Sequence, residues 1–176
     1  MKARALLVLP LLFVTLFAGC SLFPGSGTNR ALRDISRLRG MKEPVDKLPQ
    51  LVHYLSFTGG PFEKERVARA AEAAIVETGW PAILYVEASL NDVSRGKQAQ
   101  IYLLRAYTEI EGSGAVNKLL EISRDSGRPL YLRVEAVDLI AKLRWRDAKP
   151  YLKYLSEDEA LPKELRDAAK HALGHV

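Results

Sequence analysis

Cysteine and histidine are scarce in this sequence. A single cysteine and three scattered histidines among 176 residues exclude an internal disulfide framework and most metal clusters. Apolar residues make up 48% of the chain and charged residues 27%, which is an ordinary balance for a soluble globular domain. A disordered chain, a collagen-like chain and a multi-span membrane protein are therefore excluded.

Catalytic motifs are also missing. The chain has no G-x-S-x-G nucleophile elbow, no Walker-type loop and no dinucleotide-binding glycine pattern. His171 and His175 are i, i+4 neighbours, but no glutamate lies between them and no third ligand is evident, so an exposed helix end explains them better. We therefore predict no enzyme activity and assign no catalytic residue, cofactor or metal.

The first nineteen residues are typical of a secretory signal peptide. Lys2 and Arg4 precede an apolar run, Ala5 to Ala18, that only a proline and a threonine interrupt. Fourteen residues at about 1.5 Å each reach roughly 21 Å, which is short of a bilayer core of about 30 Å. Residues 1–19 are therefore expected to be a removed signal rather than a permanent span.

This signal ends in Leu16-Phe17-Ala18-Gly19-Cys20, which resembles the lipobox of bacterial lipoproteins, with Phe17 where that family usually has leucine. The resemblance implies cleavage before Cys20 and attachment of diacylglycerol and an acyl chain such as palmitate to that residue. Residues 20–28, rich in Gly, Ser and Pro, are then expected to form a flexible tether. The folded part, from residue 29, would lie in the cell envelope close to the membrane.

The target membrane follows from the residue after the cysteine. In the enterobacterial sorting pattern an aspartate there retains a lipoprotein at the inner membrane, whereas this chain has Ser21. An outer membrane location facing the periplasm is therefore favoured. The inner membrane, or the extracellular face of a single membrane, stays open.

One apolar template recurs four times in the rest of the chain. The spacing of 0, 4, 7, 8 and 11 residues makes one stripe on an α-helix, and a fixed period of 32 or 33 residues predicts a repeat architecture. The four sets are Val67, Ala71, Ala74, Ile75 and Thr78; Ala99, Leu103, Ala106, Tyr107 and Ile110; Leu132, Ala136, Leu139, Ile140 and Leu143; and Leu165, Ala169, Ala172, Leu173 and Val176.

A second apolar helix follows in each full copy. We expect an irregular helix pair over 29–57, regular repeats at about 66–91, 98–124 and 131–156, and a terminal half repeat over 163–176. Leu165 to Gly174 matches the V-R-x-x-A-A-x-A-L-G pattern of HEAT-like repeats of the phycobilisome-lyase type. Leu132-Arg133 opens its copy likewise, while Ala68 and Gln100 replace the arginine in the first two copies. This resemblance implies an all-α superhelix, or solenoid, of antiparallel helix pairs.

We predict a membrane-anchored scaffold that binds another envelope protein. This prediction rests on the expected lipid anchor, on the expected repeats and on the lack of catalytic motifs. An enzyme or enzyme accessory of the HEAT-like lyase type, or a factor that contacts peptidoglycan, remains the alternative. No nucleic-acid partner is predicted. In this family the second helices line the concave face, and four residues are expected to point outward there as a patch for an acidic partner: Lys118, Lys149, Lys153 and Tyr154. Exposed polar side chains that have no binding role would explain these four residues equally well.

Four arginines crowd the first helix after the tether, at positions 30, 33, 37 and 39. Contact with anionic lipid headgroups is one interpretation. A solvated outer face, partly neutralised by Asp34, is the simpler one and is favoured by the sequence alone.

Overall fold

Residues 26–176 are described by a computed structural model, and within this range the chain is all-helical. The expected signal peptide (1–19), Cys20 and the first part of the expected tether lie outside the described residues. The helices are α1 (Ser26–Arg39), α2 (Pro44–Tyr54), α3 (Pro61–Thr78), α4 (Ile83–Asn91), α5 (Lys97–Glu111), α6 (Val116–Arg124), α7 (Leu130–Lys142), α8 (Lys149–Glu157) and α9 (Lys163–Leu173). Short 3-10 segments, Trp80–Ala82, Gly112–Ala115 and Arg146–Ala148, lead into α4, α6 and α8.

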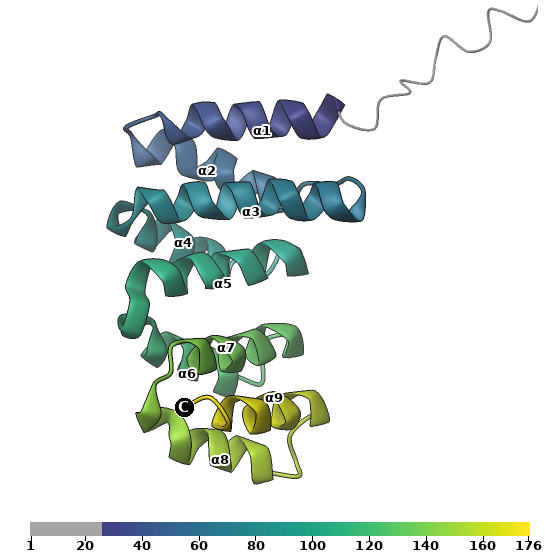
Figure 1. Cartoon of the computed structure of the whole chain (residues 1–176), viewed down its shortest axis with the longest axis vertical. Helices are drawn as coiled ribbons and strands as arrows, with labels where there is room; N and C mark the ends of the chain where they lie inside the picture. Colours follow the sequence, from purple (N-terminus) through teal and green to yellow (C-terminus); the bar gives the residue numbers. More distant parts are fainter. Residues whose placement is uncertain (1–25) are drawn as a thin grey trace, which may run out of the picture.

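The helices follow one another along the longest axis of the molecule (Figure 1). The odd-numbered helices pack in chain order, α1 on α3, α3 on α5, α5 on α7 and α7 on α9. Each of α2, α4, α6 and α8 packs on the odd-numbered helix that follows it. Contacts are thus made mainly between neighbours in the sequence. The fold class all-α is confirmed for the described residues.

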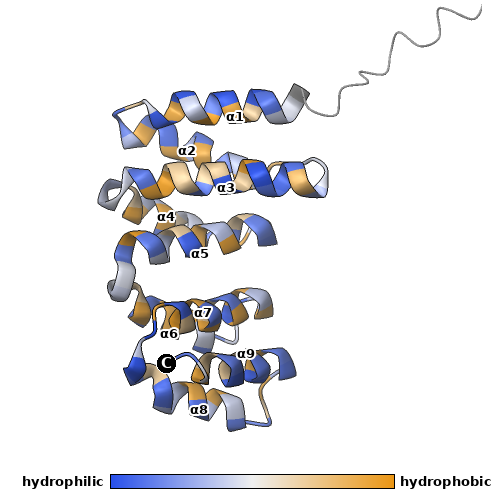
Figure 2. Ribbon diagram, in the orientation of Figure 1, coloured by the Kyte–Doolittle hydropathy of each residue, from blue (hydrophilic) through white to orange (hydrophobic). Residues whose placement is uncertain are grey.

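The core is built from the recurring apolar positions. In all four copies the side chains at template positions 0, 4 and 7 are buried, and those of the second helices are buried as well. In the first copy the corresponding buried side chain is that of Val86, next to Glu87. Figure 2 shows hydrophilic residues alternating with these apolar stripes along the helices. Burial of each large aliphatic side chain contributes about 1.5–3 kcal/mol, so the repeated stripe supplies most of the stabilisation.

Recurrent backbone features mark the joints of the repeats. Gly79 and Gly112 follow α3 and α5 with φ of 66° and 56°, a left-handed conformation that costs glycine little. In the third copy Arg144, two residues after the end of α7, also has a positive φ, of 51°. A residue of positive φ therefore follows each of the three helices.

A second joint recurs between one copy and the next. Asp92, Asp125 and Asp158 cap the C-terminal ends of α4, α6 and α8 with similar extended backbone angles. Each accepts a hydrogen bond from the backbone N–H two residues later, at 2.9–3.1 Å. This is the local turn that aspartate favours, and it recurs every 33 residues.

Two boundaries differ from the expectation. Helix α1 begins at Ser26, so the last three residues of the expected tether, 26–28, are helical, and Thr28 is buried. Helix α3 begins at Pro61 rather than near residue 66, because proline suits a first helical turn. In addition Glu63 Oε2 accepts the Gly60 N–H at 3.2 Å, which satisfies a backbone donor that the helix leaves open.

None of the helices within residues 26–176 combines the length and the apolar character needed to cross a membrane.

A charged cluster lies between the odd-numbered helices. Arg105 of α5 makes two hydrogen bonds to Glu135 of α7, with Nε–Oε1 at 2.7 Å and Nη2–Oε2 at 3.2 Å. Glu72 of α3 lies near this pair. Burial raises the pKa of Glu72 to about 7, against an ordinary value of 4.5; Arg105 opposes the rise and Glu109 adds to it.

Glu72 should therefore make stability depend on pH. Its raised pKa means that the folded state binds this proton more tightly than the unfolded chain, so charged Glu72 costs stability above pH 7 and the cost vanishes below about pH 4.5. Relative to Glu72→Gln, the wild type should lose about 1–2 kcal/mol of unfolding free energy between pH 5 and pH 8, a figure reduced for partial solvent screening. Urea denaturation at several pH values measures this difference, with Glu159→Gln as the control for removing one exposed carboxylate. A difference that stays constant over this range would contradict the prediction.

Candidate functional site

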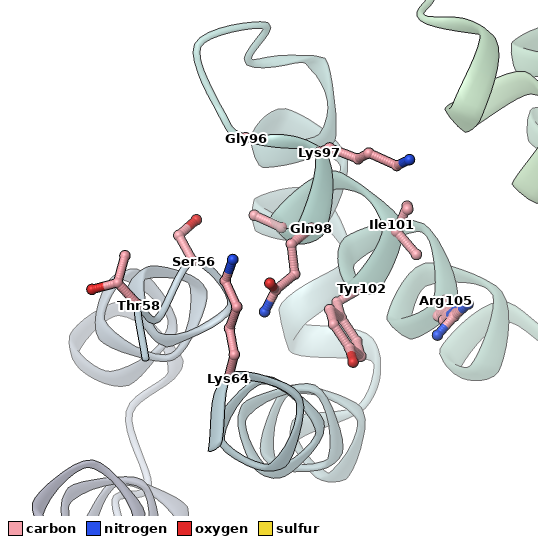
Figure 3. Close-up of a pocket in the computed structure, with 10 residues that line it drawn as sticks. Ser56, Thr58, Lys64, Gly96, Lys97, Gln98, Ile101, Tyr102 and Arg105 are labelled. Atoms are coloured by element: carbon pink, nitrogen blue, oxygen red, sulfur yellow. The ribbon is translucent and has the colours of Figure 1, made fainter. Parts of the chain in front are cut away.

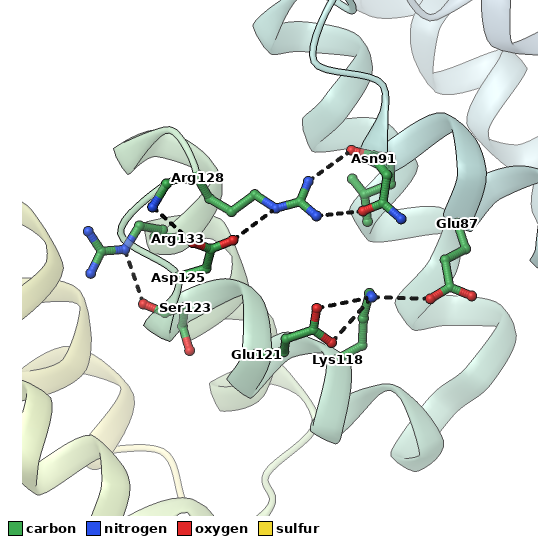
Figure 4. Close-up of polar contacts among 10 residues, drawn as sticks. Glu87, Asn91, Lys118, Glu121, Ser123, Asp125, Arg128 and Arg133 are labelled. Carbon is green, nitrogen blue, oxygen red and sulfur yellow. Dashed lines mark hydrogen bonds and ion pairs between the residues drawn. The ribbon is translucent and has the colours of Figure 1, made fainter.

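Lys118 of the expected partner patch is engaged in an ion-pair cluster. Its Nζ lies 3.1 Å from Glu87 Oε1 of α4 and 3.3 Å from Glu121 Oε2 of α6, and its side chain is only 15% exposed (Figure 4). The expectation that Lys118 points to solvent is therefore wrong. Glu87 has the same register as Leu119 and Leu152 of the next two copies, which are buried. Lys118 of the next copy neutralises the Glu87 carboxylate.

Arg128 makes a second polar link between the same two helix pairs. Its guanidinium donates to the Leu90 carbonyl at 3.3 Å and to the Asn91 side chain, and it pairs with Asp125 (Figure 4). Lys118 lies on α6 and Arg128 in the loop after it, so together they connect α4 to the next copy. These side chains hold neighbouring helix pairs in a fixed relation.

The other three patch residues lie on α8 and keep exposed side chains. Lys149 and Lys153 border a shallow hollow that Leu173 of α9 also lines, and Lys153 is 3.9 Å from Glu157, a weak exposed pair. Tyr154 is 60% exposed and lines a different hollow, toward α6. The four patch residues therefore lie in three different surroundings: the ion-pair cluster of Lys118, the hollow beside α9 that Lys149 and Lys153 border, and the hollow toward α6 that Tyr154 lines.

The hollow beside Tyr154 is the candidate site. It has a volume of about 640 Å³, within the range of pockets that hold small ligands or partner side chains. We refer to it as the α6–α8 groove. Its walls come from α6, the start of α7, α8 and the loop after α8, and its lining residues are Arg124, Arg133, Pro150, Tyr151, Tyr154, Leu155 and Leu161.

Aromatic and arginine side chains in the α6–α8 groove are held in defined positions. The Arg124 guanidinium carbon lies 4.3 Å from the centre of the Tyr151 ring, a cation–π contact. The Tyr151 hydroxyl lies 2.9 Å from the Ser123 hydroxyl, and Arg133 Nε donates to the Ser123 carbonyl at 3.1 Å. Tyr154 donates to Asp158 Oδ2 at 3.0 Å, and this hydrogen bond raises the pKa of Tyr154.

This arrangement is suited to binding rather than to covalent chemistry. Tyrosine and arginine are the residue types that most often dominate binding energy at protein interfaces. Because their partners within the chain already fix the rings and guanidinium groups, little side-chain entropy is lost on binding. Arg124 and Arg133 favour an acidic group in the occupant, and the tyrosine rings favour an apolar one beside it.

A second hollow, of about 590 Å³, lies where the N-terminal parts of α3 and α5 meet (Figure 3). In this view Lys64 rises from α3 toward Gln98 of α5, whereas Lys97 points away from both. Arg105 also lines this hollow, but Glu135 holds its guanidinium. Its cationic side chains are thus either exposed or already paired, and the α6–α8 groove is the better-defined site.

His171 and His175 lie side by side at the end of α9, with 3.3 Å between their Nε2 atoms. Both are exposed. Within residues 26–176 no group of three or more His, Cys, Asp or Glu side chains is arranged to hold a metal ion.

Sequence reasoning found part of this site. Tyr154 was expected on the outward side of the second helices, and it lines the α6–α8 groove. Tyr151, Arg133 and Leu161 were missed. The 33-residue recurrence of Asp92, Asp125 and Asp158 was an available signal for the loop that carries Leu161.

Comparison with known proteins assigns no family, since no family model matches the chain and neither a curated protein nor a solved structure similar to it was found.

Proposed function

We propose that this protein is a lipid-anchored scaffold of the bacterial cell envelope, in which HEAT-like helix pairs form a solenoid that binds another envelope protein. The anchor rests on the signal-like residues 1–19 and on Cys20, the only cysteine of the chain. We favour an outer membrane location facing the periplasm, because the residue after that cysteine is Ser21 and not the aspartate of the inner-membrane sorting pattern.

The solenoid part of the proposal is supported by recurrence. Buried positions, a residue of positive φ after the first helix and the aspartate cap after the second all return every 32–33 residues. Such units bury their apolar faces against their neighbours, and terminal units differ from the rest. The irregular pair α1–α2 and the single helix α9 suit the two terminal units.

The observation that carries the binding role is the α6–α8 groove. Tyr154 is the one exposed aromatic residue there, and Arg124 and Tyr151 are packed on each other beside it. We infer a protein partner that inserts an apolar side chain flanked by an acidic residue. Complementary charge would then set the orientation of the partner as well as the rate of encounter.

Capture of the partner tests the groove. Crosslinking in intact cells, followed by purification of the anchored chain, should recover the partner at least tenfold less well with Arg124→Glu or Tyr154→Ala, since truncation of interface tyrosine or arginine commonly costs about 2 kcal/mol or more. Leu84→Ala, at an exposed apolar residue of α4, is the control and should change nothing. Lys149→Glu with Lys153→Glu separates the two candidate surfaces, because a loss confined to that pair would place the binding site on α8 toward α9.

The lipid anchor is tested by intact mass. The mature protein should begin at Cys20 and carry the added mass of a diacylglyceryl group and an acyl chain. Cys20→Ser should abolish acylation and cleavage, although the uncut apolar run of residues 5–18 is expected to keep the chain at the membrane. A mature chain with another first residue and an unmodified thiol would refute the anchor.

A further inference from the structure

Positive charge is concentrated at one end of the described chain. Residues 26–60 hold six basic and three acidic residues, whereas residues 61–176 hold eighteen of each. The net positive charge of residues 26–176 therefore comes entirely from the segment that contains α1 and α2. Both helices lie at the end of the molecule that joins the first 25 residues (Figure 1).

The outer side of α1 is a stripe of arginines. Arg30, Arg33 and Arg37 are spaced by three and four residues, so they share one side of the helix, and all three are exposed. At 3.6 residues per turn this side is opposite to the one formed by Ala31, Ile35 and Leu38, which is buried against the rest of the chain.

These three arginines are not neutralised by the described part of the chain. Among residues 26–176 none of them has a carboxylate within ion-pair distance, while Arg39 is bound to Glu77 at 3.1 Å. Asp34, the acidic residue of α1, instead accepts a hydrogen bond from the Tyr54 hydroxyl at 3.1 Å. The sequence-based explanation, in which Asp34 partly pairs the arginines, therefore has no support in the structure.

The position of α1 brings this stripe within reach of a bilayer. Ser26 is six positions after Cys20, and an extended chain of that length spans about 20 Å at most. Helix α1 is itself about 21 Å long. The potential of anionic lipids acts within about 8 Å of the surface at physiological salt, so a helix held at such a distance samples it continually.

We propose that the Arg30–Arg33–Arg37 stripe docks on the anionic phospholipid headgroups of the membrane that holds the chain. The docking rests on the membrane attachment proposed above. It sets the orientation of the molecule, with α1 on the bilayer and the α6–α8 groove held at the far end of the helix stack. Each basic residue near an anionic surface contributes a factor of about five, so three together contribute roughly a hundredfold to the contact equilibrium.

A fluorophore on α1 tests the docking in the full chain. In the acylated chain the sulfur of Cys20, the single cysteine of the sequence, is a thioether that does not react with thiol reagents, so Ser36→Cys, at an exposed position of α1, supplies the thiol that accepts an environment-sensitive label. The labelled chain is reconstituted in vesicles of phosphatidylcholine alone or with 30% phosphatidylglycerol, each with a headgroup-attached quencher. We expect strong quenching only with phosphatidylglycerol, and its loss at high salt, where the screening length shrinks to about 3 Å.

The matched variants carry equal charge changes at opposite ends. Arg30→Glu, Arg33→Glu and Arg37→Glu together should abolish the quenching, whereas Arg146→Glu, Lys163→Glu and Lys170→Glu, all at exposed residues near the other end, should retain it. Equal quenching in both vesicle types, or in the arginine variant, would overturn the docking. Vesicle flotation of the same samples reports attachment separately. A chain that floats only with anionic vesicles would contradict the proposed attachment and support the stripe.

Discussion

Replacing Ala136 by arginine should cost most of the stability of this protein, and the same change at Ala169 should be nearly as severe. Both alanines occupy the same template position, in α7 and α9, and neither exposes any surface. Arginine there adds about six side-chain atoms to a close-packed layer and brings a charge with no partner. We expect a loss of about 3–5 kcal/mol in the free energy of unfolding, against a typical total of 5–15 kcal/mol.

Urea denaturation followed by circular dichroism measures this loss. Ala88→Arg is the matched control, because Ala88 lies on α4 with an exposed side chain and should change stability by no more than about 0.5 kcal/mol. A similar small change at Ala136 would mean that the layer between α5, α7 and α9 is not packed as described. A signal of substantial sheet in the wild-type spectrum would contradict the helical fold itself.

The regular part of the fold was predictable because its signal repeats. A single apolar stripe is weak information, but four stripes at one period average out local exceptions such as Thr78 and Glu87. The short connections at Gly79 and Gly112 marked where each second helix begins, but each second helix packs mainly on the first helix of the next copy, α4 on α5 and α6 on α7. The start of α1 was less predictable, because Ser26 and Gly27 suit a tether, and only the burial of Thr28 against the folded chain explains why the helix extends to them.

The candidate site was less predictable because it depends on contacts between copies. Lys118 has no unusual local sequence; its burial follows from Glu87, thirty-one positions earlier. Tyr151 likewise has the appearance of an ordinary surface tyrosine until Ser123 and Arg124 of the previous copy are placed beside it. Periodicity tells which side of a helix is buried, but it does not tell which polar residue of one copy meets which residue of the next.

The second residue of each copy has different surroundings in different copies. Arg133 and Arg166 stand where the repeat motif that the sequence resembles has arginine, and Ala68 and Gln100 occupy the same register in the earlier copies. Three of the four, Ala68, Gln100 and Arg133, are buried, although the motif alone suggests nothing about depth. Arg133 donates to the Ser123 carbonyl near the end of α6, whereas Arg166 Nε is buried with no hydrogen-bond partner among the described residues. The same residue type at the same register therefore has different energetic roles in two copies.

Truncation of the two arginines should accordingly give unequal losses. Arg133→Ala removes buried side-chain volume and leaves the Ser123 carbonyl without its donor, so we expect a loss of about 2–3 kcal/mol in the free energy of unfolding. Arg166→Ala removes no hydrogen bond from its Nε and should cost about 1 kcal/mol or less. Arg133→Met restores most of the volume without the donor, and a loss of about 1–2 kcal/mol is expected because the carbonyl stays unsatisfied.

Urea midpoints for the three variants, at equal m-values, measure these differences. Equal losses for Arg133→Ala and Arg166→Ala would mean that the link to Ser123 contributes nothing, and the inner wall of the α6–α8 groove would then be held by the packing of Tyr151 alone.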